Sequence, residues 1–254
     1  MHKAHLNGIT LAYERKGRGT PFVLLHGYPL DHVIWEPVVP LLEDRADLIL
    51  PDLRGFGGSE ATAGGYSLAD MAGDVAALLD SLKIKKIILA GHSMGGYIAL
   101  AFARAWPERV LGLGLVSSQA AADTPEGRQK RYATAKQVEA QGVGVVADSM
   151  PARLTSNPAL QPVLRQIANR QRPEGIVGAL KAMAGRPDCG PSFSGFNFPV
   201  AIVHGLEDGL IPIDRAREVQ AAVPRGYMVE LNGVGHMPMM EAPRLTAEAL
   251  RTLF

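Results

Sequence analysis

Short apolar runs alternate with segments of helical periodicity along most of the chain. Continuous apolar runs are typical of strands that are covered by helices on both faces of a sheet. We expect such strands at 21–25, 46–50, 87–90, 110–116, 200–203 and 227–231. A hairpin over residues 4–15 precedes them, because Asn7-Gly8 supplies the two positive-φ positions of a tight turn.

A helix is expected between the strands at 46–50 and 87–90. Its apolar positions form one helical stripe: Leu68, Met71, Val75, Leu78, Leu79 and Leu82. Ser67, with Asp70 three residues later, is typical of a capping box at its start. Strands that alternate with helices require parallel, right-handed crossovers. The pattern therefore predicts an α/β fold with a doubly wound, mostly parallel sheet.

One region interrupts this alternation. From residue 119 to residue 191 no segment has the pattern of a strand, and the apolar positions follow helical spacing, as at Ile176, Leu180 and Met183. We interpret residues 119–191 as a helical insertion. Residues 1–118 and 192–254 would then form a single core domain around it.

Composition and charge exclude several classes of function. Of 254 residues, 47% are hydrophobic, enough for one sizeable core, and the net charge is +1. So small a charge creates no broad field for phosphate backbones or anionic lipids, so we expect neither nucleic-acid nor membrane partners. No apolar run suits a signal peptide or a membrane span, and Cys189 is the single cysteine. We therefore expect a cytoplasmic protein without an internal disulfide.

The segment GHSMG, residues 91–95, has the pattern G-x-S-x-G between an apolar strand and a helical run. A serine on a sharp, strained turn needs small residues two positions before and after it, since the backbones cross there. Ser93 is therefore a candidate nucleophile. A glycine-rich turn that only joins a strand to a helix would show the same bare pattern.

A serine nucleophile requires a histidine base and a carboxylate that orients the base. His236 lies in a loop after the last predicted strand, and Asp208 lies in the loop HGLEDG after the strand at 200–203. We assign His236 as the base and Asp208 as the acid. Glu207 is the rival acid, but adjacent side chains in an extended loop point in different directions, and we prefer Asp208. We do not expect any other histidine to be the base. His92 lies beside the serine, His26 and His204 lie at the ends of buried strands, and His2, His5 and His32 lie in surface segments.

The tetrahedral intermediate of acyl transfer needs two backbone N–H donors aimed at its oxygen. The residue after the nucleophile, Met94, is one candidate. The loop HGYPL after the strand at 21–25 offers the second, and because Pro29 has no N–H we choose Tyr28.

The stretches HGYPLDHVIW, PDLRGFGGS, GHSMGGYIAL, HGLEDGLIP and GVGHMPMMEAP together resemble the α/β-hydrolase superfamily over nearly the whole chain. Within it the chain looks like compact bacterial carboxylesterases and enol-lactonases, whose helical cap lies between the sixth and seventh strands. The resemblance implies a triad of Ser93, Asp208 and His236, with Tyr28 and Met94 as the oxyanion donors. It implies no cofactor and no metal.

The resemblance favours a carboxylesterase that acts on a small-molecule ester. Dehalogenases and epoxide hydrolases of this fold use Asp where this chain has Ser93, so those activities are disfavoured. A lactonase, and a cofactor-free haloperoxidase that perhydrolyses carboxylic acids, remain alternatives, the latter because HGYPL resembles its loop. A ligand receptor with slow turnover is the alternative of another class. The natural substrate and the oligomeric state are not readable from the sequence.

Overall fold

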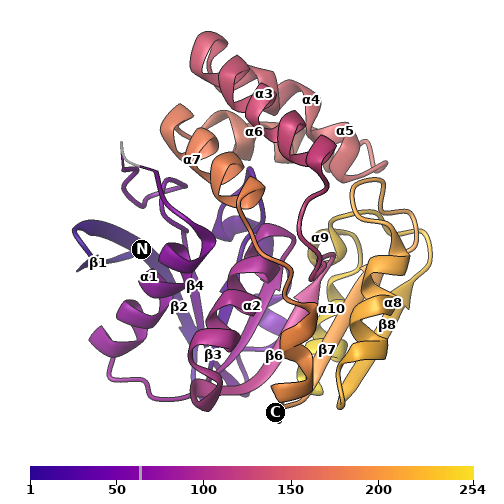
Figure 1. Ribbon diagram of the computed structural model, residues 1–254. Coiled ribbons are helices and arrows are strands. Elements are labelled where there is room, and N and C mark those ends of the chain that lie inside the picture. Colours follow the sequence, from indigo (N-terminus) through magenta and orange to yellow (C-terminus); the bar gives the residue numbers. More distant parts are fainter. Residues whose placement is uncertain (63–64) are drawn as a thin grey trace.

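An eight-stranded sheet forms the centre of the computed structural model, which describes residues 1–62 and 65–254 (Figure 1). The strands are β1 (His2–Leu6), β2 (Ile9–Gly17), β3 (Thr20–Leu25), β4 (Ala46–Pro51), β5 (Ile87–His92), β6 (Val110–Val116), β7 (Val200–Gly205) and β8 (Gly226–Leu231). Their order across the sheet is β1-β2-β4-β3-β5-β6-β7-β8. β2 is antiparallel to β1 and β4, and the other neighbours are parallel. The predicted α/β class and mostly parallel sheet are confirmed.

Each predicted strand is present, and several extend beyond the apolar run. β5 continues through Gly91 to His92, because these residues still pair with β6. The hairpin also forms as predicted: Asn7 has a φ of 51° and Gly8 a φ of 76°, between the paired strands β1 and β2.

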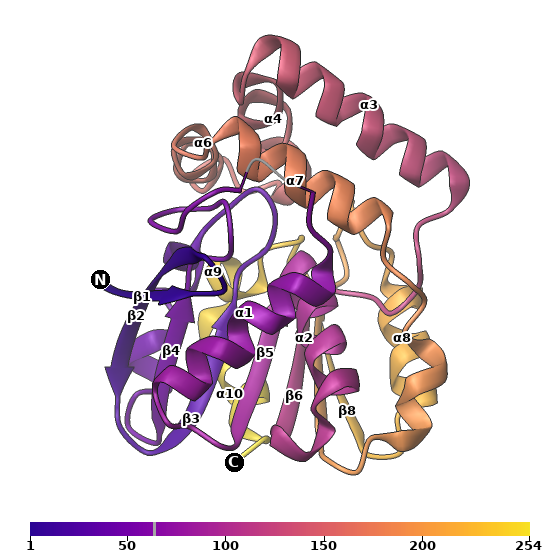
Figure 2. The same ribbon diagram turned by 60° about the vertical axis from the view of Figure 1, so that its left-hand side comes forward.

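Helices cover both faces of the sheet. The α-helices are α1 (Leu68–Ser81), α2 (Met94–Ala105), α3 (Pro125–Gln141), α4 (Gly144–Ser149), α5 (Pro151–Leu154), α6 (Gln161–Asn169), α7 (Pro173–Ala184), α8 (Ile213–Ala222), α9 (Pro238–Glu241) and α10 (Pro243–Arg251). The described residues also form short 3-10 helices: η1 (His32–Trp35), η2 (Val39–Leu41), η3 (Pro107–Arg109) and η4 (Gly190–Gly195). In Figure 2, α1 and α2 lie in front of the sheet and α10 lies behind it.

Local contacts explain where these helices start and how they pack. Ser67 and Asp70 form both halves of the predicted capping box at α1, with Asp70 N–H donating to Ser67 Oγ at 3.1 Å and Ser67 N–H donating to Asp70 Oδ2 at 2.7 Å. On the other face, a Cβ at Gly114 would lie only 2.8 Å from Cδ2 of Leu250. The glycine therefore lets α10 pack directly on β6.

Helices α3 to α7 all follow β6 and precede β7, and residues 117–199 contain no strand. Figures 1 and 2 show α3, α4, α6 and α7 together above one end of the sheet. The short helix η4 begins at Gly190 and ends at Gly195, so it crosses the expected boundary between residues 191 and 192. Within residues 1–62 and 65–254, no helix has the length and apolar character needed to span a bilayer.

Candidate active site

Ser93 occupies a strained turn between β5, which ends at His92, and α2, which begins at Met94. Its φ is 51° and its ψ is −113°. A side chain other than glycine rarely adopts a positive φ, and residues held in this way cluster at functional sites. The backbone holds the turn in place, since Ser93 N–H donates to the carbonyl of Val116 at 2.9 Å.

The two glycines of the GHSMG segment are required by backbone packing. A Cβ at Gly91 would collide with the carbonyl group of Gly95, and a Cβ at Gly95 would collide with the carbonyl oxygen of Leu25. The turn at Ser93 therefore forms only when both flanking positions lack a side chain, which is the physical reason for the pattern in the sequence.

A buried hydrogen bond joins His236 to Asp208. His236 Nδ1 donates to Asp208 Oδ2 at 2.7 Å, and the two side chains are 1% and 0% exposed. Asp208 Oδ1 accepts the N–H groups of Leu210 and Ile211 at 2.8 and 2.9 Å. Burial opposes ionisation, but the hydrogen bond and charge of His236, with these N–H donors, hold the pKa of Asp208 below its usual value. Glu207, the rival acid, is exposed.

The backbone around His236 is held from three sides. His236 N–H donates to the carbonyl of Leu154, in α5, at 2.9 Å. His92 Nε2 donates to the carbonyl oxygen of His236 at 2.8 Å. Glu241 accepts the N–H of Gly235 at 3.1 Å and that of Met237 at 3.0 Å. This loop therefore has little freedom to move the imidazole.

Sequence reasoning missed the positioning contacts of Glu241 and His92. The signal for Glu241 is a carboxylate five residues after the candidate base, on the short helix α9. Its two carboxylate oxygens accept hydrogen bonds from the backbone N–H groups of the residues before and after His236, much as a capping side chain accepts from free N–H groups at a helix end. No local signal indicates the partner of His92, because that contact spans 144 positions.

Two further histidines are buried beside this pair. Burial lowers the pKa of His92 well below its usual value and also lowers the pKa of His204. His204 Nε2 donates to the carbonyl of Ile211 at 2.8 Å and lies 3.3 Å from Asp208 Oδ2. Both imidazoles are thus neutral near pH 7 and act as hydrogen-bonding supports.

A cavity of about 370 Å³ lies between the carboxyl ends of the strands and the helices of residues 119–191. Ser93, His236 and Tyr28 line it together with Met150 and Met183. Tyr28 follows β3 and is 7% exposed. Met94 is buried as the first residue of α2, where backbone N–H groups have no partner within the helix.

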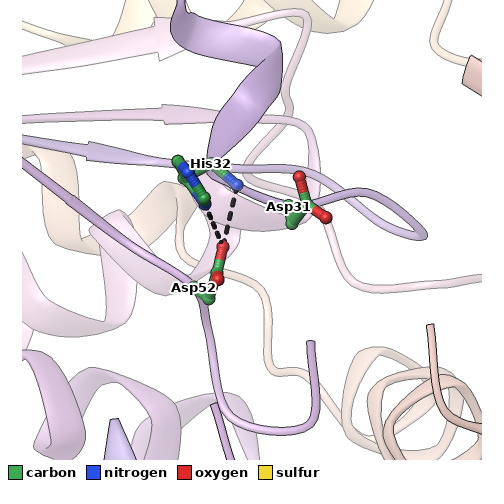
Figure 3. Close-up of side chains that lie close together, drawn as sticks. All are labelled: Asp31, His32 and Asp52. Carbon is green, nitrogen blue, oxygen red and sulfur yellow. Dashed lines mark hydrogen bonds and ion pairs between the residues drawn. The ribbon is translucent and has the colours of Figure 1, made fainter. Parts of the chain in front are cut away.

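A cluster of Asp31, His32 and Asp52 has the composition of a metal site, so its partners decide its role (Figure 3). Asp52 Oδ1 accepts from His32 N–H at 3.0 Å and from His32 Nδ1 at 2.6 Å. Asp31 accepts two bonds from Arg170, both 2.7 Å, and one from Gln171 at 2.9 Å. Because N–H donors already occupy these oxygens, we interpret the cluster as an ion-pair network that joins η1 and β4 to the end of α6.

The expectation that His32 lies in a surface segment is wrong. Its side chain is 13% exposed, because η1 turns it onto Asp52. Burial opposes protonation, but the hydrogen bond and charge of Asp52 raise the pKa of His32 above its usual value.

Comparison with known proteins reaches across most of the chain. A sequence model described as the alpha/beta hydrolase fold matches residues 20–243. A thermophilic esterase from Thermogutta terrifontis, solved with malate bound, superposes with a TM-score of 0.94 at 34% identity, covering 99% of this chain and 96% of that chain. The enol-lactonase from Burkholderia xenovorans LB400 superposes with a TM-score of 0.92 at 26% identity, covering 99% of both chains.

Curated relatives match over unequal shares of their length. An AB hydrolase superfamily protein from Bacillus subtilis is 31% identical over 239 residues, which cover 90% of this chain and 89% of the relative. A soluble epoxide hydrolase from Corynebacterium sp. is 41% identical, but over only 102 residues, which cover 40% of this chain and about a third (36%) of that enzyme.

Proposed function

The chain belongs to the α/β-hydrolase family, as its motifs predict, and from this we propose that it is a serine hydrolase that cleaves small carboxylic esters. One observation carries the proposal: the buried 2.7 Å hydrogen bond between His236 and Asp208, beside a cavity that Ser93 and His236 both line. A serine in a strained turn, a histidine and an ionised carboxylate are the groups that acyl transfer requires.

In the proposed first step, Ser93 Oγ attacks the carbonyl carbon of the ester while His236 Nε2 accepts the hydroxyl proton. The bond to Asp208 fixes the proton on Nδ1 of His236, so that Nε2 carries the lone pair. The imidazolium that forms is stabilised by the charge of Asp208. His236 then donates its proton to the departing alkoxide, which leaves as the alcohol, and an acyl-enzyme remains on Ser93.

In the second step, water attacks the acyl-enzyme while His236 accepts its proton, and the carboxylic acid is released as Ser93 regains its hydrogen. Both steps place negative charge on the former carbonyl oxygen. We assign the backbone N–H groups of Tyr28 and Met94 to that oxygen, each worth on the order of a hundredfold in rate. The burial of both residues supports this, because donors act more strongly where water is excluded.

We further propose that residues 119–191 act as a cap over a core of residues 1–118 and 192–254. The cavity supports this division, since Met150 and Met183 from the helical region line it together with Ser93 and His236 from the core. A ligand bound there would be enclosed by both parts, as is usual for small-molecule sites.

The likeness to a thermophilic esterase at 34% identity supports ester hydrolysis, and the likeness to an enol-lactonase at 26% identity supports a lactone as the second candidate substrate. A lactone is a cyclic ester, so the same two steps apply, with the alcohol remaining attached to the product.

Steady-state hydrolysis of 4-nitrophenyl acetate, butyrate and octanoate by the parent and by Ser93→Ala tests the proposal. The variant should lose activity by about 10⁴-fold or more. Ser81→Ala, which removes a hydroxyl at the end of α1 outside the cavity, is the matched control and should keep it. Activity retained by Ser93→Ala would contradict the mechanism, and release of one equivalent without further turnover would instead indicate a receptor.

A further inference from the structure

A second cavity, of about 490 Å³, lies beside the first. It is formed by one face of α2, the start of α1, the end of α7 and residues 185–189, and its lining is mostly apolar. The residues of α2 that line it recur at helical spacing: Tyr97, Leu100, Ala101, Arg104 and Ala105. The catalytic mechanism proposed above makes no use of this space.

The two cavities meet at Tyr97 and Gln119, which line both. Tyr97 lies one helical turn after Ser93, and its N–H donates to the carbonyl of Ser93 at 3.3 Å. Its side chain is buried, with 5% of the residue exposed. One of the two side chains at the boundary therefore lies on the first turn of the helix that follows the proposed nucleophile.

Arg186 holds the ring of Tyr97 in this position. The guanidinium carbon lies 4.2 Å from the ring centroid, a close cation–π contact. Arg186 is itself fixed by Asp123 at 2.7 Å and by two backbone carbonyls at 3.1 Å each. Gln119 Nε2 reaches Tyr97 Oη at 3.5 Å, which is long for a hydrogen bond and therefore weak. Of these two contacts, the cation–π contact with Arg186 is the stronger.

We propose that the apolar cavity is a second compartment of the substrate site, which takes the distal end of a long unbranched acyl chain, and that Tyr97 limits entry to it. The proposal rests on the ester hydrolysis proposed above. The acyl group is the part of the substrate bonded to Ser93, and Tyr97 is one turn from Ser93, so the acyl chain is the part that meets this boundary. Leu68, Leu100 and Ala101 offer it an apolar surface.

Removal of the ring tests the boundary directly. In Tyr97→Ala, the ratio of kcat/KM for 4-nitrophenyl decanoate to kcat/KM for 4-nitrophenyl butyrate should be at least tenfold higher than in the parent. Each methylene that enters an apolar compartment strengthens binding of the acyl chain by about fourfold. Tyr97→Phe retains the ring and should keep the ratio of the parent. Tyr132→Ala removes an exposed tyrosine of α3 and is the matched control. An unchanged ratio in Tyr97→Ala would overturn the proposal.

A second substitution shows where the chain goes. Ala101→Phe fills the second cavity from α2, and Ala101 does not line the cavity of Ser93. Added to Tyr97→Ala, it should return the ratio to the value of the parent. If the raised kcat/KM ratio persists in this double variant, the acyl chain lies elsewhere. If Tyr97→Ala instead raises kcat/KM for alkyl acetates with longer alcohols, the cavity takes the alcohol. Either result would overturn the proposal.

Binding without turnover separates this proposal from the proposed function. Decanoate should bind Ser93→Ala/Tyr97→Ala at least tenfold more tightly than Ser93→Ala, as measured by calorimetry, whether or not Ser93 is the nucleophile. Equal affinities would contradict the compartment, whereas hydrolysis of 4-nitrophenyl butyrate by Ser93→Ala would contradict the mechanism alone. If Tyr97→Ala loses cooperative unfolding, Tyr97→Val replaces it in both measurements.

Discussion

His92 and His236 are 144 positions apart in the sequence, yet Nε2 of His92 donates to the backbone carbonyl oxygen of His236 at 2.8 Å. Their ring centroids are 4.9 Å apart. Because His92 directly precedes Ser93, this bond ties the strand that carries the proposed nucleophile to the loop that carries the proposed base. Burial lowers the pKa of His92 well below its usual value, so the imidazole is neutral near pH 7 and its single N–H is the one that donates to His236.

The first prediction concerns this bond. His92→Leu leaves a buried carbonyl at His236 without its donor, a loss of about 1–3 kcal/mol that loosens the loop. We expect kcat on 4-nitrophenyl butyrate to fall about tenfold with little change in KM, as measured by steady-state kinetics. A rise in KM at constant kcat would instead show that His92 acts on substrate binding.

The second prediction distinguishes the two carboxylates of the HGLEDG loop. Asp208→Asn removes the charge that stabilises the imidazolium and presents an amide to His236, so kcat should fall by about 10³–10⁴-fold. Glu207→Gln, at an exposed neighbouring position, should stay within about twofold of the parent. Equal losses in the two variants would leave Asp208 without the orienting role.

The features that sequence could predict are those with a local cause. The Asn7-Gly8 turn, the Ser67 and Asp70 capping box, and the runs of β5 and β7 each depend on a few neighbouring residues. The spatial order of strands was not predicted. β3 lies between β4 and β5 in the sheet, so that the chain passes from β2 across to β3 and back to β4. That order depends on crossovers and packing, which no single segment encodes.

In the candidate site too, local features could be predicted from the sequence and long-range contacts could not. The GHSMG segment predicts the turn at Ser93, because two glycines are needed for backbones to cross there. Long-range contacts such as that of His92 with His236 were not predictable, since each partner has an ordinary local context. The same holds for Tyr97, whose helical position is visible in the sequence, but whose place between two cavities depends on α7 and residues 185–189.

The third prediction is a pH dependence of stability from His32 and Asp52. The pKa of His32 is raised in the folded state, so its contribution is complete below the unfolded pKa of about 6.5 and is lost as pH rises through the folded value. The pKa of Asp52 is lowered despite burial, chiefly by the bond to His32, so Asp52 stays ionised over this range. His32→Gln should therefore reduce the free energy of unfolding more at about pH 5.5 than at about pH 9.

Urea unfolding of the parent and of His32→Gln at both pH values measures this difference. His5→Gln, which replaces an exposed histidine of β1, is the matched control and should show a much smaller dependence. A larger loss at about pH 9 would reverse the sign and contradict the assigned pKa shift.

The fourth prediction concerns the ion pair of Asp31 and Arg170, which links the loop before η1 to the end of α6. The Asp31 side chain is 1% exposed and that of Arg170 is 46% exposed, so water screens only the arginine. Arg170→Met leaves a buried carboxylate with fewer donors and should lower the free energy of unfolding by about 1–3 kcal/mol, less than for a fully buried pair. Asp31→Asn in the Arg170→Met background removes the uncompensated charge and should restore part of this loss. A double-mutant cycle from urea unfolding measures the coupling, and strictly additive losses would mean that the pair contributes nothing of its own.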